Sequence, residues 1–396
     1  MKKNLLLLPL FACILLFNHS LLAQCIDGFN ILGQRCSGSV KTATPFLRIV
    51  PDARSGAMGD VGIALTPDAN AIYYNASNLA MADNKWGASV NYTPWFRNVR
   101  IPDFNLFNGA GYYQFGQNKK QAISLGLHYF SWGDITFTDF NANPLTEPKP
   151  REMSITGAYS RQLNNKWAIG LSAKYIYSSF ARHSDNPLGI ESDKTFAIDI
   201  STTYKKPIMI ANLNTNLTIG AVVSNVGNKI MHLNNSDFLP ANLGIGGAWE
   251  VPFNANHKLL FSVEFNKLLV VTPQPNDSIG SRKDISVVKG MFNSFSDAPN
   301  GFKEEMQEIT TSMGIEYWLF QHLALRGGYF HENQYKGGRE FYTLGGGLRY
   351  KMYGFNISYL KSIPNADISW RPLDNTWRFS LLLNGFTAKD TRLSSL

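Results

Sequence analysis

The sequence predicts an all-β fold, a transmembrane antiparallel β-barrel of about 14 strands with an N-terminal segment that serves as a periplasmic or lumenal hatch. Three observations predict this class. Segments from residue 86 onward alternate apolar with small or polar side chains. Their connections alternate between short and long. The composition combines 13% aromatic with only 17% charged residues. Such alternation suits strands with lipid on one face and a lumen on the other.

The composition excludes several other classes. Aromatic and β-branched residues are too abundant for a disordered chain, and 3 cysteines are too few for a disulfide scaffold. Beyond residue 23, no apolar run approaches the roughly 20 residues of a membrane-spanning helix. The formal net charge is +8, but no run of Lys or Arg exceeds 2 residues, so we expect no nucleic-acid binding.

Residues 1–23 have the features of an export signal. Lys2 and Lys3 precede an apolar stretch, and the predicted cleavage follows Ala23. Cys25 and Cys36 are the cysteines of the mature chain, and an oxidising compartment would join them in a structural disulfide. Lipidation of Cys25 is the alternative. No histidine lies close to them in sequence, so we expect no metal site.

Residues 24–85 do not alternate and are long enough to fold into the barrel as a hatch or plug. The glycine-rich stretch at residues 55–62, SGAMGDVG, allows tight backbone bends. It lacks the lysine and the flanking strand and helix of a phosphate-binding loop, so we expect no nucleotide or other cofactor.

The barrel is predicted to span residues 86–386, followed by a C-terminal tail at 387–396. Predicted strands cover 86–96, 105–116, 121–135, 151–163, 167–180, 194–205, 214–225, 240–251, 258–270, 309–319, 322–331, 340–351, 354–361 and 376–386. Short connections predict periplasmic turns and long ones predict extracellular loops, of which 271–308 is the longest. A soluble β-sandwich is disfavoured because the non-lipid face consists of Gly, Ser, Thr and charged residues.

The side chains on the two strand faces have different expected roles. Aromatic residues near the strand ends are expected to form membrane-interface girdles. These are Tyr92, Trp95, Phe96, Tyr112, Tyr113, Trp132, Trp167, Tyr175, Tyr177, Trp249, Tyr317, Trp318 and Trp377. Charges of both signs are expected in the lumen, and ion pairing with the plug is the simplest interpretation. These are Lys174, Arg326, Arg349, Arg378, Asp199, Glu264 and Glu316.

Several stretches resemble known barrel families. VPDARSGAMGDVGIALTPDANAIYYNASNLA (50–80) resembles the hatch of barrels related to the FadL fatty-acid transporter, although Asn75-Ala-Ser-Asn-Leu79 replaces that family's Asn-Pro-Ala-Gly-Leu. EFNKLLVVTPQP (264–275), SFSDAPNGFKEEMQEI (294–309) and LRGGYFHE (325–332) resemble PorV, the outer-membrane barrel family of the type IX secretion system of Bacteroidetes.

This resemblance implies a FadL-like barrel in outer-membrane lipid with no enzymatic activity and no cofactor. It also implies a cargo shuttle. Such proteins bind the C-terminal signal domain of secreted cargo, receive the cargo at the SprA/Sov-type translocon barrel, and deliver it to the PorU–PorZ attachment complex.

The longest loop is the candidate partner-binding site. Phe302, Met306 and Ile309 recur at i, i+4 and i+7, which predicts a short helix with an apolar stripe. The candidate binding residues are Phe295, Asp297, Phe302, Glu304, Glu305 and Met306. Either the stripe grips a β-rich cargo domain or the translocon rim, or the helix folds back over the barrel mouth and packs the stripe on the protein's own aromatics.

Two other functions are weaker. A FadL-like channel for small hydrophobic molecules would need an apolar lumen, whereas the inward positions are small or charged. A lipid hydrolase would need a Ser–His pair, and no Gly-x-Ser-x-Gly elbow or His-Glu-x-x-His motif occurs. His128, near Ser124 and Ser131, is the best catalytic candidate, but we expect it to be an ordinary wall histidine.

Overall fold

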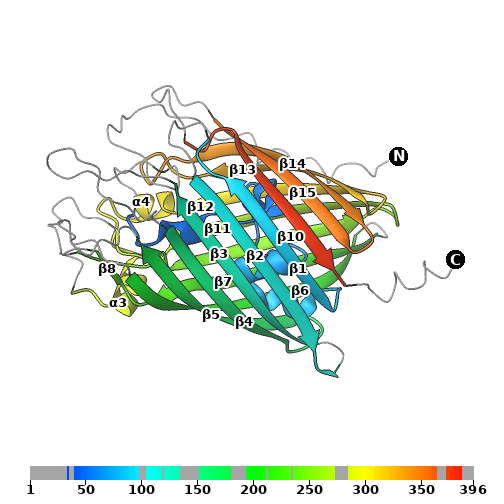
Figure 1. The fold of residues 1–396 in the computed structure, drawn as a ribbon, viewed down its shortest axis with the longest axis horizontal. Coiled ribbons are helices and arrows are strands. Elements are labelled where there is room, and N and C mark those ends of the chain that lie inside the picture. The colour runs from blue at the N-terminus through cyan, green and yellow to red at the C-terminus, as the bar shows by residue number, and fades with distance from the viewer. Residues whose placement is uncertain are drawn as a thin grey trace, which may run out of the picture.

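The computed structural model describes residues 34, 40–97, 104–117, 120–133, 151–179, 193–210, 213–232, 235–272, 284–363 and 372–385. The predicted export signal, the Cys25–Cys36 pair and the tail at 387–396 lie outside the described residues. Fourteen antiparallel strands close into one barrel, in which each strand pairs with its neighbours along the chain and β1 pairs with β16 (Figure 1).

The strands confirm the fourteen segments predicted from the sequence. They are β1 (Trp86–Pro94), β2 (Phe104–Phe115), β3 (Gln121–Trp132), β4 (Arg151–Gln162), β5 (Trp167–Ser179), β6 (Asp193–Ile210), β7 (Leu213–Gly227), β10 (Asn242–Pro252), β11 (His257–Leu268), β12 (Thr310–Leu319), β13 (Leu323–His331), β14 (Glu340–Tyr350), β15 (Tyr353–Ser362) and β16 (Thr376–Asn384). A small sheet of β8 (Ile230–His232) and β9 (Asn235–Asp237), which the sequence did not predict, lies in the connection between β7 and β10.

The barrel has two distinct ends. Tight turns such as those between β4 and β5 and between β14 and β15 gather at one end, called here the turn end, where Gly87 pairs with Asn384. Long connections gather at the opposite end, called the loop end. This confirms the predicted alternation of short and long connections.

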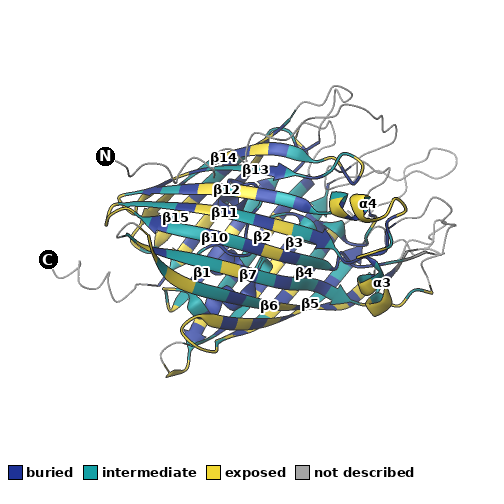
Figure 2. Cartoon of the chain, turned by 180° about the vertical axis from the view of Figure 1, so that it is seen from behind, coloured by how far each residue is buried: buried dark blue, intermediate teal, exposed yellow. Residues whose placement is uncertain are grey.

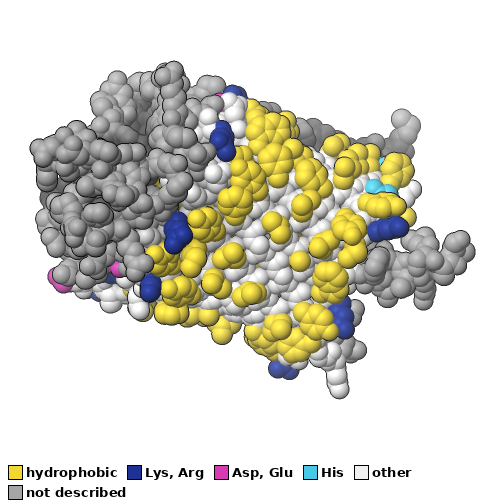
Figure 3. All heavy atoms as spheres, viewed as in Figure 1, with side chains coloured by type: hydrophobic (Ala, Val, Ile, Leu, Met, Phe, Trp, Pro, Cys, Tyr) yellow, Lys and Arg dark blue, Asp and Glu magenta, His cyan; other side chains and the backbone are white. Residues whose placement is uncertain are grey.

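The outer surface of the barrel is apolar. Along β3, Ile123, Leu125 and Leu127 are exposed, whereas Ala122, His128 and Phe130, on the opposite phase of the strand, are buried. Figure 2 shows the same alternation along the strands, and Figure 3 shows the resulting hydrophobic outer surface. An apolar surface this extensive is far larger than a soluble monomer exposes, so its natural solvent is lipid.

The girdle prediction is only partly correct. Tyr113, Trp167 and Trp377 face outward and are exposed. Other predicted girdle residues are buried instead: Trp95, Phe96, Tyr112 and Trp318. Tyr112 and Trp318 lie on the inward phase of their strands. Trp95 and Phe96 follow the end of β1 and pack into an aromatic cluster of the interior.

Residues 40–85, called here the lumenal segment, lie inside the ring (Figure 1). They form the short helices η1 (Pro45–Arg48), α2 (Ala53–Gly56), η2 (Ala69–Tyr73) and η3 (Ala76–Met81). Helix α2 packs on β14, β15 and β16, whereas η3 packs mainly on β4 and β5. None of the described helices is long and apolar enough to cross a bilayer.

Side-chain caps and one tight bend shape the lumenal segment. The carboxylate of Asp52 accepts from the Ser55 N–H at 2.9 Å, and the side chain of Asp68 accepts from the Asn70 N–H at 2.8 Å, so each starts a helix. Gly59 has a φ of 70°, which confirms the expected tight bend in the glycine-rich stretch. A side chain on Gly328 of β13 would overlap the backbone of this bend.

Charged side chains join the lumenal segment to the wall, which confirms the predicted ion pairing for two wall residues. Glu316 of β12 accepts from Arg54 at 2.8 Å and from Arg326 at 2.7 Å. Arg378 of β16 lies 3.4 Å from Asp60. These contacts offset the cost of burying charge, because each ion has an opposite charge beside it.

The other predicted lumenal charges have different partners. Glu264 accepts from the backbone N–H groups of Gly62 and Ile63 at 2.8 and 2.9 Å. Lys174 pairs with Asp199 of the wall itself at 2.8 Å, so this ion pair does not involve the lumenal segment. Arg349 is exposed near the turn end and stacks over the Trp318 ring at 4.6 Å.

Candidate functional site

The candidate site lies in the connection between β11 and β12, at the loop end, where two short helices form. Helix α3 (Val287–Asn293) begins after Ser286, whose hydroxyl accepts from the Lys289 N–H at 3.3 Å. Gly290 faces the ring of Phe238, and α3 rests on an apolar cluster that includes Val270 and Val271. Helix α3 is therefore anchored to the barrel by one face only.

Helix α4 (Phe302–Gln307) is anchored by charge. Lys267, at the loop end of β11, donates to Glu305 at 2.9 Å and to Glu308 at 2.7 Å. Lys336, in the connection between β13 and β14, donates to Glu308 at 2.9 Å and to Glu304 at 2.6 Å. Glu305, Glu308 and both lysines are buried. We call these five residues the α4 latch.

The turn before α4 depends on the same carboxylates. Glu305 also accepts from the Ala298 N–H at 2.8 Å, and Glu304 accepts from the Asn300 N–H at 2.8 Å. Asp297 accepts from the Thr272 N–H at 3.1 Å. Burial raises the pKa of the Asp297 carboxyl, and hydrogen bonds from the Thr272 backbone and side chain oppose this effect. These contacts fix the loop to the rim of the barrel.

Hydrogen bonding controls the charge states in the α4 latch. Burial alone would raise the pKa of Glu304, but hydrogen bonds from Lys336 and Asn300 lower it below its ordinary value. Burial would lower the pKa of Lys336, but its hydrogen bonds to Glu304 and Glu308 raise it. Both groups therefore stay ionised at neutral pH.

Because the acidic face of α4 is turned inward, its apolar residues point outward. Phe302 is 79% exposed and Met306 is 51% exposed. On α3, Phe292 is 75% exposed, and Val288 one turn earlier is also exposed. Phe295, between the helices, is exposed as well. We call Val288, Phe292, Phe295, Phe302 and Met306 the apolar loop face.

The six predicted site residues thus divide into two groups. Phe295, Phe302 and Met306 lie on the exposed surface, whereas Asp297, Glu304 and Glu305 hold the loop in place. Phe302 and Met306 do not pack on the protein's own aromatics, because Lys267 and Lys336 attract the glutamates inward. Ile309, the third residue of the predicted stripe, lies after the end of α4 and is half-buried.

Apart from Glu308, which directly follows α4, sequence reasoning missed four residues of this site. Val288 and Phe292 are spaced i, i+4 on α3, so the same helical periodicity that identified the stripe on α4 would have identified them. Lys267 lies within one of the stretches that carry the family resemblance, but its role depends on α4, which follows it by 35 residues. Nothing in the local sequence around Lys336 indicates its partners.

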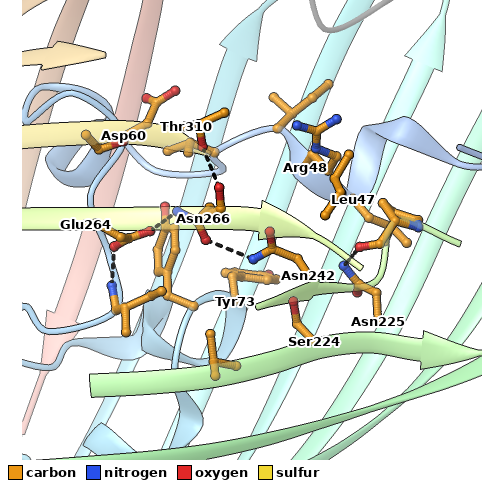
Figure 4. A pocket seen from close by; sticks show the side chains of 18 of the residues that line it. Leu47, Arg48, Asp60, Tyr73, Ser224, Asn225, Asn242, Glu264, Asn266 and Thr310 are labelled. Atoms are coloured by element: carbon orange, nitrogen blue, oxygen red, sulfur yellow. Dashed lines mark hydrogen bonds between the residues drawn. The ribbon is translucent and has the colours of Figure 1, made fainter. Parts of the chain in front are cut away.

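A chamber of about 170 Å³ lies between the lumenal segment and the wall (Figure 4). Figure 4 shows Asn225, Asn242 and Asn266 on neighbouring strands around it, with Glu264 and Asp60 nearby. The Asn242 amide donates to Asn266 at 2.8 Å. Apolar side chains such as Leu47, Ile49 and Phe330 complete the lining, so the chamber has a mixed polar and apolar surface.

His128 is also buried in the wall of this chamber. Its ring makes edge contacts with Phe46 and Tyr73 at centroid distances of 5.2 and 5.9 Å. Within the described residues, its Nε2 atom has no hydrogen-bond partner. The ring is thus packed in an aromatic environment rather than paired with a serine.

The closed ring of fourteen antiparallel strands, its apolar exterior and its ion-paired interior define an outer-membrane β-barrel whose lumen is occupied by its own N-terminal segment. The sequence model of the type IX secretion system protein PorV matches residues 33–275. The chain belongs to this PorV family. No curated protein sequence matches it.

Solved structures with a similar arrangement include hydrocarbon transporters. The Ralstonia pickettii toluene transporter TbuX aligns at 10% identity over 85% of this chain and 98% of its own, with a TM-score of 0.47. The Pseudomonas putida toluene transporter TodX aligns at 12% identity over 84% and 98%, with a TM-score of 0.47. A Pseudomonas aeruginosa FadL homologue aligns at 11% identity over 88% and 99%, with a TM-score of 0.44.

Proposed function

We propose that this protein is a non-enzymatic cargo carrier of the type IX secretion system. It binds the C-terminal signal domain of secreted proteins, receives them at the SprA/Sov-type translocon barrel and passes them to the PorU–PorZ attachment complex. The observation that carries the proposal is the apolar loop face. Large apolar side chains are directed away from the barrel, on helices whose opposite faces are anchored to it.

The energetics of this surface favour a partner. Burying a side chain such as Phe302 or Phe292 contributes roughly 1.5–3 kcal/mol. Few interface residues supply most of the binding energy, and aromatic anchors are prominent among them. The α4 latch keeps the loop ordered before a partner arrives, which reduces the entropy lost on binding. A rigid apolar surface suits a folded β-rich domain that offers an apolar sheet edge or face.

The test is binding of a purified cargo C-terminal domain to the protein in mild detergent. We compare the variant F292A/F302A/M306A with the control K289A/K303A, whose lysines are exposed on the same two helices. The apolar variant should lose at least about tenfold in affinity, which corresponds to about 1.4 kcal/mol. The control should bind normally, and both variants should keep the heat-modifiable mobility of a closed barrel.

Capture of the translocon barrel is measured separately with the same variants. Loss of cargo binding alone assigns the apolar loop face to cargo, and loss of translocon capture alone assigns it to the translocon rim. Normal capture of both partners and normal cargo release by F292A/F302A/M306A would contradict a role for this face.

A further inference from the structure

The turn end of the barrel carries a row of cations on four adjacent strands. Lys120 and Arg161 lie at the facing ends of β3 and β4, where the Gln162 N–H donates to the Lys120 carbonyl at 2.8 Å. Lys166 precedes β5, and its carbonyl accepts from the Lys205 N–H of β6 at 2.8 Å. Lys206 follows. We call Lys120, Arg161, Lys166, Lys205 and Lys206 the basic row.

No carboxylate on the described parts of the flanking strands pairs with the basic row. None of the five cations has an ion-pair partner in the described part of the chain. The strands that surround it contain no Asp or Glu over long described stretches. These stretches are 104–117, 120–133, 157–179, 200–210 and 213–232. The loop end differs, because the lysines of the α4 latch, and Lys361 with Asp374, are matched by carboxylates.

The basic row borders the lipid-facing surface. Trp167, next to Lys166, is 43% exposed and packs against Tyr204 at a centroid distance of 4.8 Å. Tyr159, two residues before Arg161, is exposed on the same outward face. Tyr and Trp favour the headgroup level of a membrane. Figure 3 shows Lys and Arg side chains at the margins of the hydrophobic outer surface. The basic row therefore lies at headgroup depth.

We propose that the basic row is a binding site for the phosphate groups of anionic phospholipids in the leaflet at the turn end. Phosphate oxygens are strong acceptors for ammonium and guanidinium donors. Each Lys or Arg near an anionic membrane surface contributes about 1 kcal/mol of attraction, which enriches anionic lipid beside it about fivefold. The row follows the membrane edge along several strands rather than forming a compact patch with an apolar centre, so it fits a lipid annulus better than a protein interface.

The test uses nanodiscs made from equal amounts of phosphatidylethanolamine and phosphatidylglycerol, with native mass spectrometry of the lipids that stay bound. Wild-type protein should retain more phosphatidylglycerol than phosphatidylethanolamine, and added salt should reduce this enrichment. The variant R161Q/K166Q/K206Q should lose it by roughly tenfold or more. The control R151Q/K194Q/K361Q removes outward-facing cations at the loop end and should retain the enrichment.

Three outcomes would overturn the proposal. The first is equal retention of the two lipids by wild-type protein. The second is an equal loss of enrichment in the control variant. The third is unchanged lipid binding in R161Q/K166Q/K206Q. If this variant also fails to co-purify an acidic periplasmic protein that wild-type protein retains, the row is assigned to a protein partner. Heat-modifiable mobility confirms that each variant is folded. Cargo binding is measured in parallel, so the lipid proposal stands or falls separately from the cargo proposal.

Discussion

Lys267→Met provides a direct test of why the apolar loop face is displayed. The substitution preserves most of the side-chain volume but removes the cation that bridges Glu305 and Glu308. Among the described residues, Glu305 then keeps its hydrogen bond from the Ala298 N–H, whereas Glu308 keeps Lys336 and the Thr272 hydroxyl. Leaving a buried ion without its partner costs about 3–5 kcal/mol.

This cost should appear as local opening rather than as loss of the barrel, because the α4 latch lies outside the strand ladder. Every 1.4 kcal/mol changes an equilibrium about tenfold, so the open population should rise by roughly two to three and a half orders of magnitude. Hydrogen exchange of backbone amides in residues 297–309, measured in detergent, reports this population. Lys303→Met, at an exposed position on the same helix, is the matched control and should leave protection unchanged.

A second variant separates charge from packing. Lys267→Met combined with Glu305→Met removes both members of one ion pair, so part of the lost protection should return. If Lys267→Met changes exchange by less than about threefold, or if Lys303→Met changes it equally, the buried charges do not hold the helix and our explanation of its orientation is wrong.

Three further predictions concern the interior and the loop. Gly328→Ala should displace the bend at Gly59, at a cost of about 3 kcal/mol. The lumenal segment should then become accessible to added protease. Gly157→Ala, at an open position of the wall, is the control and should leave the segment protected. Glu316→Gln should weaken the anchorage of Arg54 by about 3–5 kcal/mol. The midpoint of thermal unfolding in detergent should fall, and the strand signal in circular dichroism of the folded protein should not change. The lowered pKa of Glu304 stabilises the loop above its ordinary value of 4.5, so exchange at α4 should increase as the pH falls below that value, and Glu304→Gln should remove most of this dependence.

Much of the fold follows from the sequence because each strand must satisfy two solvents. The alternation of Leu125 and Leu127 with His128 and Phe130 is a local signal, and it located all fourteen strands. The contacts of the lumenal segment are not local. Arg54 and Glu316 are 262 residues apart, and no pattern near either residue identifies the other.

The orientation of α4 could not be predicted for a related reason. Its periodicity correctly indicated an amphipathic helix, but periodicity does not state which face is buried. That choice depends on Lys267 and Lys336, which belong to different parts of the barrel rim. In this loop, paired charges are buried and apolar side chains are exposed, which reverses the usual rule for a surface helix.

Two anchors of the lumenal segment depend on the last strand of the barrel. Its backbone N–H at Ala53 donates to the Ser380 hydroxyl at 2.8 Å, and Asp60 lies beside Arg378, so both anchors are on the final strand. A nascent chain that lacks β16 would have neither these anchors nor a partner for the free edge of β1. Two of the contacts that hold the lumenal segment therefore form only when the sheet closes, whereas its contacts with Glu264 and Glu316 involve strands that precede β16.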